Sequence, residues 1–124
     1  MASGGQAVTF PKRGSVYLVR FDPTEGSEIA KTRPALIIQN DIGNRASNVT
    51  IVAAITSKFH LPLHHTNVLV KAPEGGLDVD SVVRLDQIRS VDKRRLSRRL
   101  GALRPATMRQ VHHAIVLSLG LIDL

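Results

Sequence analysis

Short apolar runs separated by turn-forming residues make up most of this 124-residue chain, and they predict a sheet-rich fold. Residues 14–22 alternate in character and stop at a proline, which indicates a strand buried for much of its length on both sides. Residues 35–38 are apolar on both faces and rich in branched side chains, so they predict a covered strand that Pro34 opens. Further strands are predicted at residues 49–56, 66–71, 79–85 and 87–91.

Helical signals are strongest near the C-terminal end. Residues 104–120 carry a proline near their start and an apolar face that ends at Gly120, which predicts a terminal helix. Leucines with helical spacing at residues 93–103 predict a short helix at best, because Gly101 weakens it. Residues 40–47 predict a single helical turn, and the apolar tail 121–124 is expected to be docked, for example at a subunit interface. The elements together predict a mainly β fold with α: a small barrel-like antiparallel sheet with appended helices.

A polar loop of about a dozen residues, 22–33, separates the first two strands. It is longer than a hairpin needs, which makes it a candidate functional loop. Arg33 closes the loop, and Pro34 biases Arg33 toward extended backbone, so its guanidinium is expected on a rigid platform at the mouth of a strand. From the backbone alone, an arginine in this position more often simply flanks a strand in solvent.

The length fits one domain, expected at residues 12–124 after a flexible arm at residues 1–11. The absence of cysteine excludes disulfides and thiolate metal sites, which fits a reducing compartment. The N-terminus has neither a basic start nor a long apolar core, and no stretch approaches the ~20 apolar residues that cross a bilayer. A cytoplasmic protein without a membrane partner is therefore expected.

The net charge of +7, from 17 Lys and Arg against 10 Asp and Glu, favours a polyanionic partner, either nucleic acid or an acidic protein. Asp92 is the only acid between positions 89 and 109, so the excess is local. Four aromatic residues are too few for the stacking platform of a dedicated single-strand binder. The eight cations of this basic stretch are Arg89, Lys93, Arg94, Arg95, Arg98, Arg99, Arg104 and Arg109.

Metal and acid–base sites find little support in the sequence. Three histidines surround Pro62 without a nearby carboxylate, and the adjacent pair on the terminal helix points about 100° apart, so neither group predicts a metal site. Asp78 and Asp80 could bind magnesium from one side of a strand, but a turn that enters a strand explains them as well. No phosphate-binding glycine loop, serine elbow or cysteine nucleophile is present. The histidines are His60, His64, His65, His112 and His113.

A series of short segments stands out along the chain: GSVY at 14–17, FDP at 21–23, GSE at 26–28, RP at 33–34, QNDIGN at 39–44, VAAIT at 52–56 and LDQIRSVD at 85–92. In order and in spacing, from about residue 12 to the C-terminus, this series resembles the MazF/PemK toxins of bacterial toxin–antitoxin pairs. The resemblance implies a compact barrel-like, SH3-like twisted antiparallel sheet with a C-terminal helix and short helices. It also implies a homodimer that cleaves single-stranded RNA at specific sequences without a metal or cofactor and is restrained by a cognate antitoxin.

The family resemblance also implies site residues. The catalytic pair is an arginine before the strand-opening proline and a threonine that ends the Ala-Ile-Thr strand, here Arg33 and Thr56. Polar side chains with donors and acceptors suit the reading of splayed-out bases. By similarity, RNA-contacting roles are expected for Glu28, Asn40, Ser81 and Gln87.

The implied reaction uses the neighbouring 2′-OH as nucleophile and leaves a 2′,3′-cyclic phosphate and a 5′-OH. Arginine is a poor general base at neutral pH, so Glu28 is the first choice for that role, with Asp22 or a loop histidine as alternatives. Two other functions stay open: a toxin of the same architecture that poisons a protein such as DNA gyrase, and a small barrel that binds RNA without cutting it. The +7 charge predicts an acidic, partly disordered antitoxin.

Overall fold

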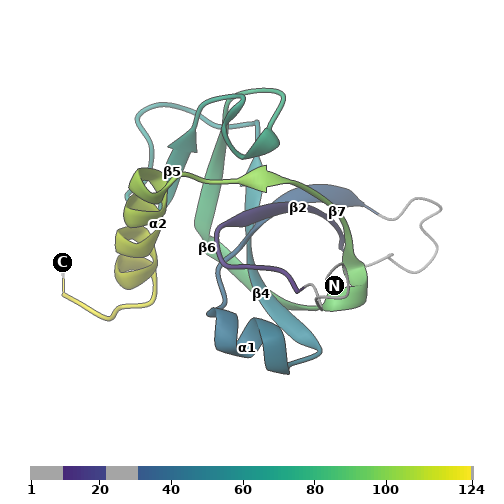
Figure 1. Cartoon of the computed structure of the whole chain (residues 1–124). Coiled ribbons are helices and arrows are strands. Elements are labelled where there is room, and N and C mark those ends of the chain that lie inside the picture. The colour runs from purple at the N-terminus through teal and green to yellow at the C-terminus, as the bar shows by residue number, and fades with distance from the viewer. Residues whose placement is uncertain (1–9, 22–30, 124) are drawn as a thin grey trace.

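A curled antiparallel sheet of six strands forms the body of the molecule in the computed structural model, which describes residues 10–21 and 31–123. The strands lie in the spatial order β5-β6-β4-β3-β2-β7, and every neighbouring pair is antiparallel. Figure 1 shows the sheet bending into a partly closed barrel, which confirms the mainly β fold expected from the sequence. The strands are β2 (Ser15–Arg20), β3 (Thr32–Ile37), β4 (Val49–Thr56), β5 (Asn67–Val70), β6 (Ser81–Asp92) and β7 (Leu96–Ala102).

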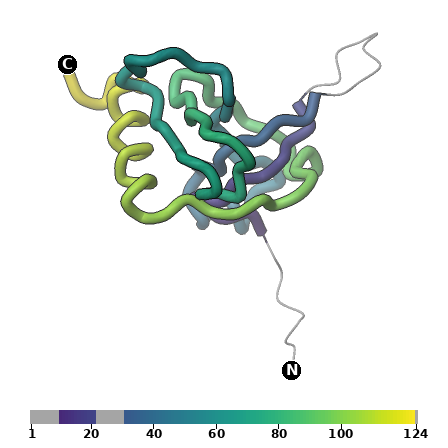
Figure 2. Tube along the Cα trace, turned by 90° about the horizontal axis from the view of Figure 1, so that it is seen from above, coloured from purple at the N-terminus to yellow at the C-terminus, as the bar shows by residue number. Residues whose placement is uncertain are grey.

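Short helical elements accompany the sheet in the described part of the chain. The C-terminal helix packs against β5 and β6 at one side of the molecule, as Figure 1 and Figure 2 show. It begins at Pro105, a position where a missing N–H costs nothing because the first turn of a helix has no acceptor for it. The predicted terminal helix and the predicted turn at residues 40–47 are confirmed. The elements are α1 (Asp41–Ala46), η1 (Glu74–Gly76), η2 (Lys93–Arg95) and α2 (Pro105–Ser118).

The sheet buries apolar side chains on both faces, which explains the continuous apolar runs. A first core joins the sheet to α2 and includes Leu36, Leu85 and Val111. A second core receives side chains from β2, β3, β4 and β6, with Leu96 of β7 packed against it, so it lies inside the curl of the sheet. The members of this second core are Val19, Ala35, Ile37, Val52 and Val91. Each fully buried branched side chain stabilises the fold by about 1.5–3 kcal/mol.

β3 begins two residues before Pro34, and not at Pro34 as expected. Pro34 pairs with Leu18 of β2, whereas the pairing of β3 with β4 covers only the three residues that follow Pro34. Ile38 N donates to Ile51 O on β4 (2.9 Å), so even-numbered residues of this strand direct their backbone groups toward β4. Pro34 has no N–H to donate there, and the β3–β4 ladder ends beside it.

The two strands predicted at residues 79–85 and 87–91 are one strand, β6, with an irregularity in the middle. Ala53 of β4 lies opposite Ile88, but its neighbour Ala54 lies opposite Arg84. One step along β4 thus corresponds to four steps along β6, so three residues between positions 84 and 88 form a bulge.

The short helix expected at residues 93–103 is wrong. This stretch forms η2 and then β7, which pairs with β2 at one edge of the sheet. Two register shifts interrupt the β2–β7 pairing, and Leu96 reaches the second core whereas Leu100 reaches the first. The four-residue spacing of Leu96 and Leu100 therefore arises from an irregular strand whose side chains pack into two different cores.

The described residues of the C-terminal tail, 121–123, are exposed and do not dock within the chain. Leu121 is 66% exposed and Ile122 is 47% exposed, and Leu119, directly after α2, is 58% exposed. Docking at a subunit interface therefore stays a prediction.

Most of the expected N-terminal arm, residues 1–11, lies outside the described residues. Pro11 is buried, however, and the guanidinium of Arg45 lies 5.3 Å from the centre of the Phe10 ring. The last two residues of the expected arm thus contact the domain. Among the described residues, no helix combines the length and the apolar character that crossing a membrane requires.

Candidate active site

Arg33 and Thr56 lie opposite each other at the place where β3 and β4 separate. The register that pairs Ala35 with Ala54 leads, two residues further, from Ala35 to Arg33 and from Ala54 to Thr56. Opposed residues of an antiparallel pair share a face of the sheet, and residues two apart on a strand share it too. Arg33 and Thr56 therefore project on the side of the second core, at its mouth, because Ala35 belongs to that core.

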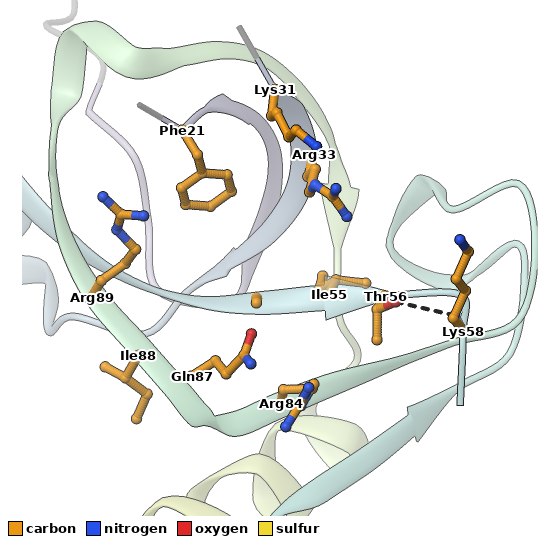
Figure 3. A pocket seen from close by; sticks show the side chains of 11 residues that line it. Phe21, Lys31, Arg33, Ile55, Thr56, Lys58, Arg84, Gln87, Ile88 and Arg89 are labelled. Atoms are coloured by element: carbon orange, nitrogen blue, oxygen red, sulfur yellow. Dashed lines mark hydrogen bonds between the residues drawn. The ribbon is translucent and has the colours of Figure 1, made fainter. Parts of the chain in front are cut away.

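A basic cleft of about 760 Å³, called here the first cleft, contains both residues (Figure 3). Among the described residues that line it there is no carboxylate, although Asp86, outside the lining, pairs with Arg84 at 2.7 Å. A cleft lined by one sign of charge concentrates an oppositely charged ligand. Its cations are Lys31, Arg33, Lys58, Arg84 and Arg89.

The first cleft also has aromatic and aliphatic surface. Phe21 and Ile88 line it, and the guanidinium of Arg89 lies 5.1 Å from the centre of the Phe21 ring. This distance is typical of a cation–π contact. An aromatic ring with a stacked guanidinium beside several cations suits a ligand that carries both a flat ring and a negative charge.

The hydroxyl of Thr56 is held by the turn that follows β4. Its oxygen accepts a hydrogen bond from the backbone N–H of Lys58 at 3.1 Å, drawn as a dashed line in Figure 3. This bond uses acceptor capacity of the oxygen and leaves the O–H itself as a donor. Thr56 can therefore donate a hydrogen bond from a fixed position near Arg33.

A second cleft of about 520 Å³ lies on the other side of the pair. It shares Arg33, Thr56 and Lys58 with the first cleft, and it adds Arg98 and Arg99 of β7. The pair thus stands on a wall common to two recesses. An extended ligand that passes from one cleft to the other would cross Arg33 and Thr56.

The sequence places the protein among known relatives. Over residues 12–119 it matches the family of PemK-like, MazF-like toxins of type II toxin–antitoxin systems. The chain belongs to this family. It is 46% identical over 112 residues to endoribonuclease EndoA of Bacillus subtilis, which covers 90% of this chain and 97% of EndoA. Endoribonuclease MazF of Staphylococcus saprophyticus is likewise 46% identical over 110 residues, which covers 89% of this chain and 92% of that protein.

Solved structures show the same fold. An endoribonuclease from a mycobacterial species, in complex with its cognate antitoxin, superposes with a TM-score of 0.76 at 27% identity, covering 92% of this chain and 99% of that chain. The resemblance to MazF/PemK toxins and the expectation of an endoribonuclease toxin are thus confirmed at the level of the family. These relatives favour the nuclease over the gyrase poison and over the non-catalytic barrel.

The toxin brings together four of the six residues expected in its site. Gln87 lines the first cleft with Arg33 and Thr56, and Ser81 lines the second. Ser81 is buried, and its hydroxyl donates to Val79 O at 3.0 Å. Its side chain thus already has a partner within its own turn.

Of the other two expected residues, Asn40 lines neither cleft. Asn40 lies seven residues after Arg33, beyond the opposite end of β3, and each residue of a strand adds about 3.3 Å to their separation. Its side-chain oxygen caps α1 by accepting a hydrogen bond from Gly43 N at 2.7 Å. Glu28, like the alternative base Asp22, lies outside the described residues.

Several lining residues were missed from the sequence. Lys31 and Lys58 each lie two positions from a predicted catalytic residue, so the period of two in an extended chain could have identified them. Phe21, which follows β2, and Arg84 of β6 gave no such signal, because only the curl of the sheet brings these segments to the same space.

The histidines and Asp80 lie outside both clefts, whereas Asp78 lines the second cleft. None of the loop histidines lines either cleft, and His112 and His113 are exposed on α2. The carboxylate of Asp80 accepts from Ala72 N at 2.9 Å, which supports the turn that enters β6. Within residues 10–21 and 31–123, no three His, Asp or Glu side chains are grouped as a metal site.

Proposed function

We propose that this toxin cleaves single-stranded RNA by attack of a 2′-OH on the adjacent phosphate, with Arg33 and Thr56 as its catalytic residues. The observation that carries the proposal is their opposition across the open end of the β3–β4 ladder, on the wall between two basic clefts. The membership in the toxin family and the endoribonuclease relatives support the same reaction class.

In the proposed step, the 2′ oxygen forms a bond to phosphorus while the bond from phosphorus to the 5′ oxygen breaks. A base takes the 2′ proton and the departing 5′ oxygen takes up a proton from water, so the products are a 2′,3′-cyclic phosphate and a 5′-OH. Negative charge develops on the non-bridging oxygens during this step. The guanidinium of Arg33 offers a rigid fork of donors that matches two of these oxygens, and Thr56 adds its O–H. Donors aimed at developing charge are worth about 3–4 kcal/mol each.

Proton transfer needs other groups. Arginine keeps its proton at neutral pH, so Arg33 is unsuited to accept the 2′ proton. The described residues that line the first cleft include no histidine and no carboxylate. We therefore assign the role of base to Glu28, which belongs to the loop that ends at Arg33.

The substrate is proposed to be single-stranded because its bases must leave a stack to be read. Phe21 and Arg89 offer a surface on which an unstacked base can lie, and the carboxamide of Gln87 offers a donor and an acceptor for a base edge. Ser81 and Asn40 remain proposed RNA contacts from similarity, with Ser81 better placed because it lines the second cleft.

The proposed partners are a second copy of the chain and an acidic antitoxin, acting in the cytoplasm. Exposed apolar side chains at the end of α2 and in the tail give a surface that a second copy could cover. The +7 charge and the basic clefts favour an acidic segment as the inhibitor.

The test incubates the purified protein with a library of short RNAs and maps the new ends by sequencing. Cleavage at a defined site, with cyclic phosphate at one end, 5′-OH at the other and full activity in EDTA, is expected. Thr56→Val should remove most of the activity and Thr56→Ser should keep much of it, since only serine retains the hydroxyl. Products with a 5′-phosphate, or activity lost in EDTA, would contradict the proposed chemistry.

A further inference from the structure

The bulge in β6 lies at the rim of the first cleft. Its three residues, Leu85, Asp86 and Gln87, are the ones left without a partner on β4. Figure 3 shows Gln87 and Arg84 along this stretch of β6, beneath the end of β4 that carries Thr56. The bulge is therefore the part of the sheet that presents Gln87 to the cleft.

The first residue of the bulge is fixed on two sides. Leu85 is fully buried, and its N–H donates to Thr66 O at 2.9 Å, just before β5. Its carbonyl oxygen accepts from the hydroxyl of Ser118 on α2 at 2.6 Å. Leu85, the first residue of the bulge, is thus held by two hydrogen bonds. Asp86 and Gln87, the next two residues, need a further interaction to fix their positions.

An ion pair joins Arg84, the residue before the bulge, to Asp86, the middle residue of the bulge. Arg84 Nε lies 3.2 Å from Asp86 Oδ1, and Arg84 Nη2 lies 2.7 Å from Asp86 Oδ2, a fork-to-fork arrangement. The hydrogen bonds from Arg84 lower the pKa of the Asp86 carboxyl, and the same bonds raise the pKa of Arg84. Bidentate pairs of this kind fix geometry as well as charge.

We propose that Arg84 and Asp86 are positioning residues that hold Gln87 in the orientation in which its carboxamide reads a nucleobase. The proposal rests on the function proposed above. Arg84 is then not primarily a phosphate anchor, because the edge of its guanidinium that bears Nε and Nη2 is occupied by Asp86. The pair would set base preference at the cleavage site rather than the rate of cleavage in general.

The chain contains a matched control. Arg94 and Asp92 have the same two-residue spacing and the same fork, with Nε–Oδ1 and Nη2–Oδ2 distances of 3.1 Å each, and they do not line either cleft. The experiment compares Asp86→Asn, Arg84→Leu, the exchanged pair Arg84→Asp with Asp86→Arg, and Asp92→Asn. It measures kcat/KM on the preferred RNA and on RNAs with one base changed.

We expect the ratio of kcat/KM between preferred and altered RNA to fall about tenfold in Asp86→Asn and Arg84→Leu, the discrimination that one good base contact supplies. Asp92→Asn should keep the ratio, and the exchanged pair should restore it to within about threefold. An unchanged ratio in both single variants would overturn the proposal. If kcat/KM instead fell equally on every RNA, and the exchanged pair did not restore it, Arg84 would be a phosphate anchor.

A measurement without RNA separates this proposal from the proposed function. The side-chain amide protons of Gln87 give an NMR signal whose position depends on their surroundings. Asp86→Asn should shift or broaden that signal and Asp92→Asn should not. If the wild type cuts no RNA, the proposed function fails, and the NMR signal alone then decides whether the pair positions Gln87. A signal that Asp86→Asn leaves unchanged would refute the positioning role of the pair.

Discussion

Replacing Arg33 by alanine should abolish most RNA cleavage without disturbing the fold. The side chain is exposed among the described residues and belongs to neither core, so stability should change by no more than about 0.5 kcal/mol. The lost donors face developing charge and are worth about 3–4 kcal/mol in the transition state. At 1.36 kcal/mol per tenfold, this corresponds to a fall in kcat of about 10²–10³.

The assay follows single-turnover cleavage of a short fluorescent RNA, with melting temperature measured on the same preparations. Arg33→Lys keeps the charge but not the fork, so it should recover only part of the activity. Arg109→Ala removes the same charge from an exposed position on α2 outside both clefts and should leave kcat within about twofold of wild type. Activity of Arg33→Ala within about threefold of wild type, or full activity of Arg33→Lys, would refute the reasoning.

Other consequences can be checked on stability and binding. Asn44 is fully buried, and its side-chain oxygen accepts from Thr50 Oγ1 at 2.7 Å, so Asn44→Ala should cost about 2–4 kcal/mol in chemical denaturation; a loss below about 1 kcal/mol would contradict this. The backbone hydrogen bond from Arg13 lowers the pKa of Asp41, so its stabilisation is present above the unfolded-state pKa and is lost as pH falls through the lower folded-state value. Asp41→Asn should therefore narrow the difference in melting temperature between pH 7 and pH 3, and an unchanged difference would speak against it. RNA affinity should fall with salt at a log–log slope of about −2, from about −0.7 for each of three cations, Lys31, Arg33 and Lys58, and a flat response would exclude phosphate binding there.

The central strands were predictable because each of them serves two apolar cores. Leu36 faces one core while Ala35 and Ile37 face the other, and this two-sided burial leaves a continuous apolar run in the sequence. The edge strand β7 was mistaken for a helix because its leucines reach different cores across register shifts. Hydrophobic periodicity in a sequence identifies an element that buries one face. It does not identify a strand whose twist directs its apolar side chains into two different cores.

The site was predictable only in part for a related reason. Arg33 lies at the start of β3 and Thr56 at the end of β4, so local sequence and the family resemblance located them together. Phe21 directly follows β2 and Arg84 belongs to β6; these two strands are not neighbours in the sheet, and the residues meet at the cleft because the sheet curls. Curvature of this kind depends on bulges and pairing irregularities that single-sequence patterns do not specify.

Pro34 links the fold to the reaction, and Pro34→Val tests that link. Valine would supply an N–H directed at β4 and allow the ladder to continue past Ala35, opposite Ile55. A new hydrogen bond gains about 0.5–1.5 kcal/mol, while losing proline costs about 0.4–1 kcal/mol through the unfolded chain, so stability should change little. The longer β3–β4 ladder would bring Arg33 and Thr56 closer together and narrow the space for a phosphate. RNA cleavage should therefore fall although both side chains remain. Hydrogen exchange should show the amide of the new residue protected from solvent. An unprotected amide with full activity would mean that proline does not hold the clefts open, and the separation of β3 from β4 would then need another cause.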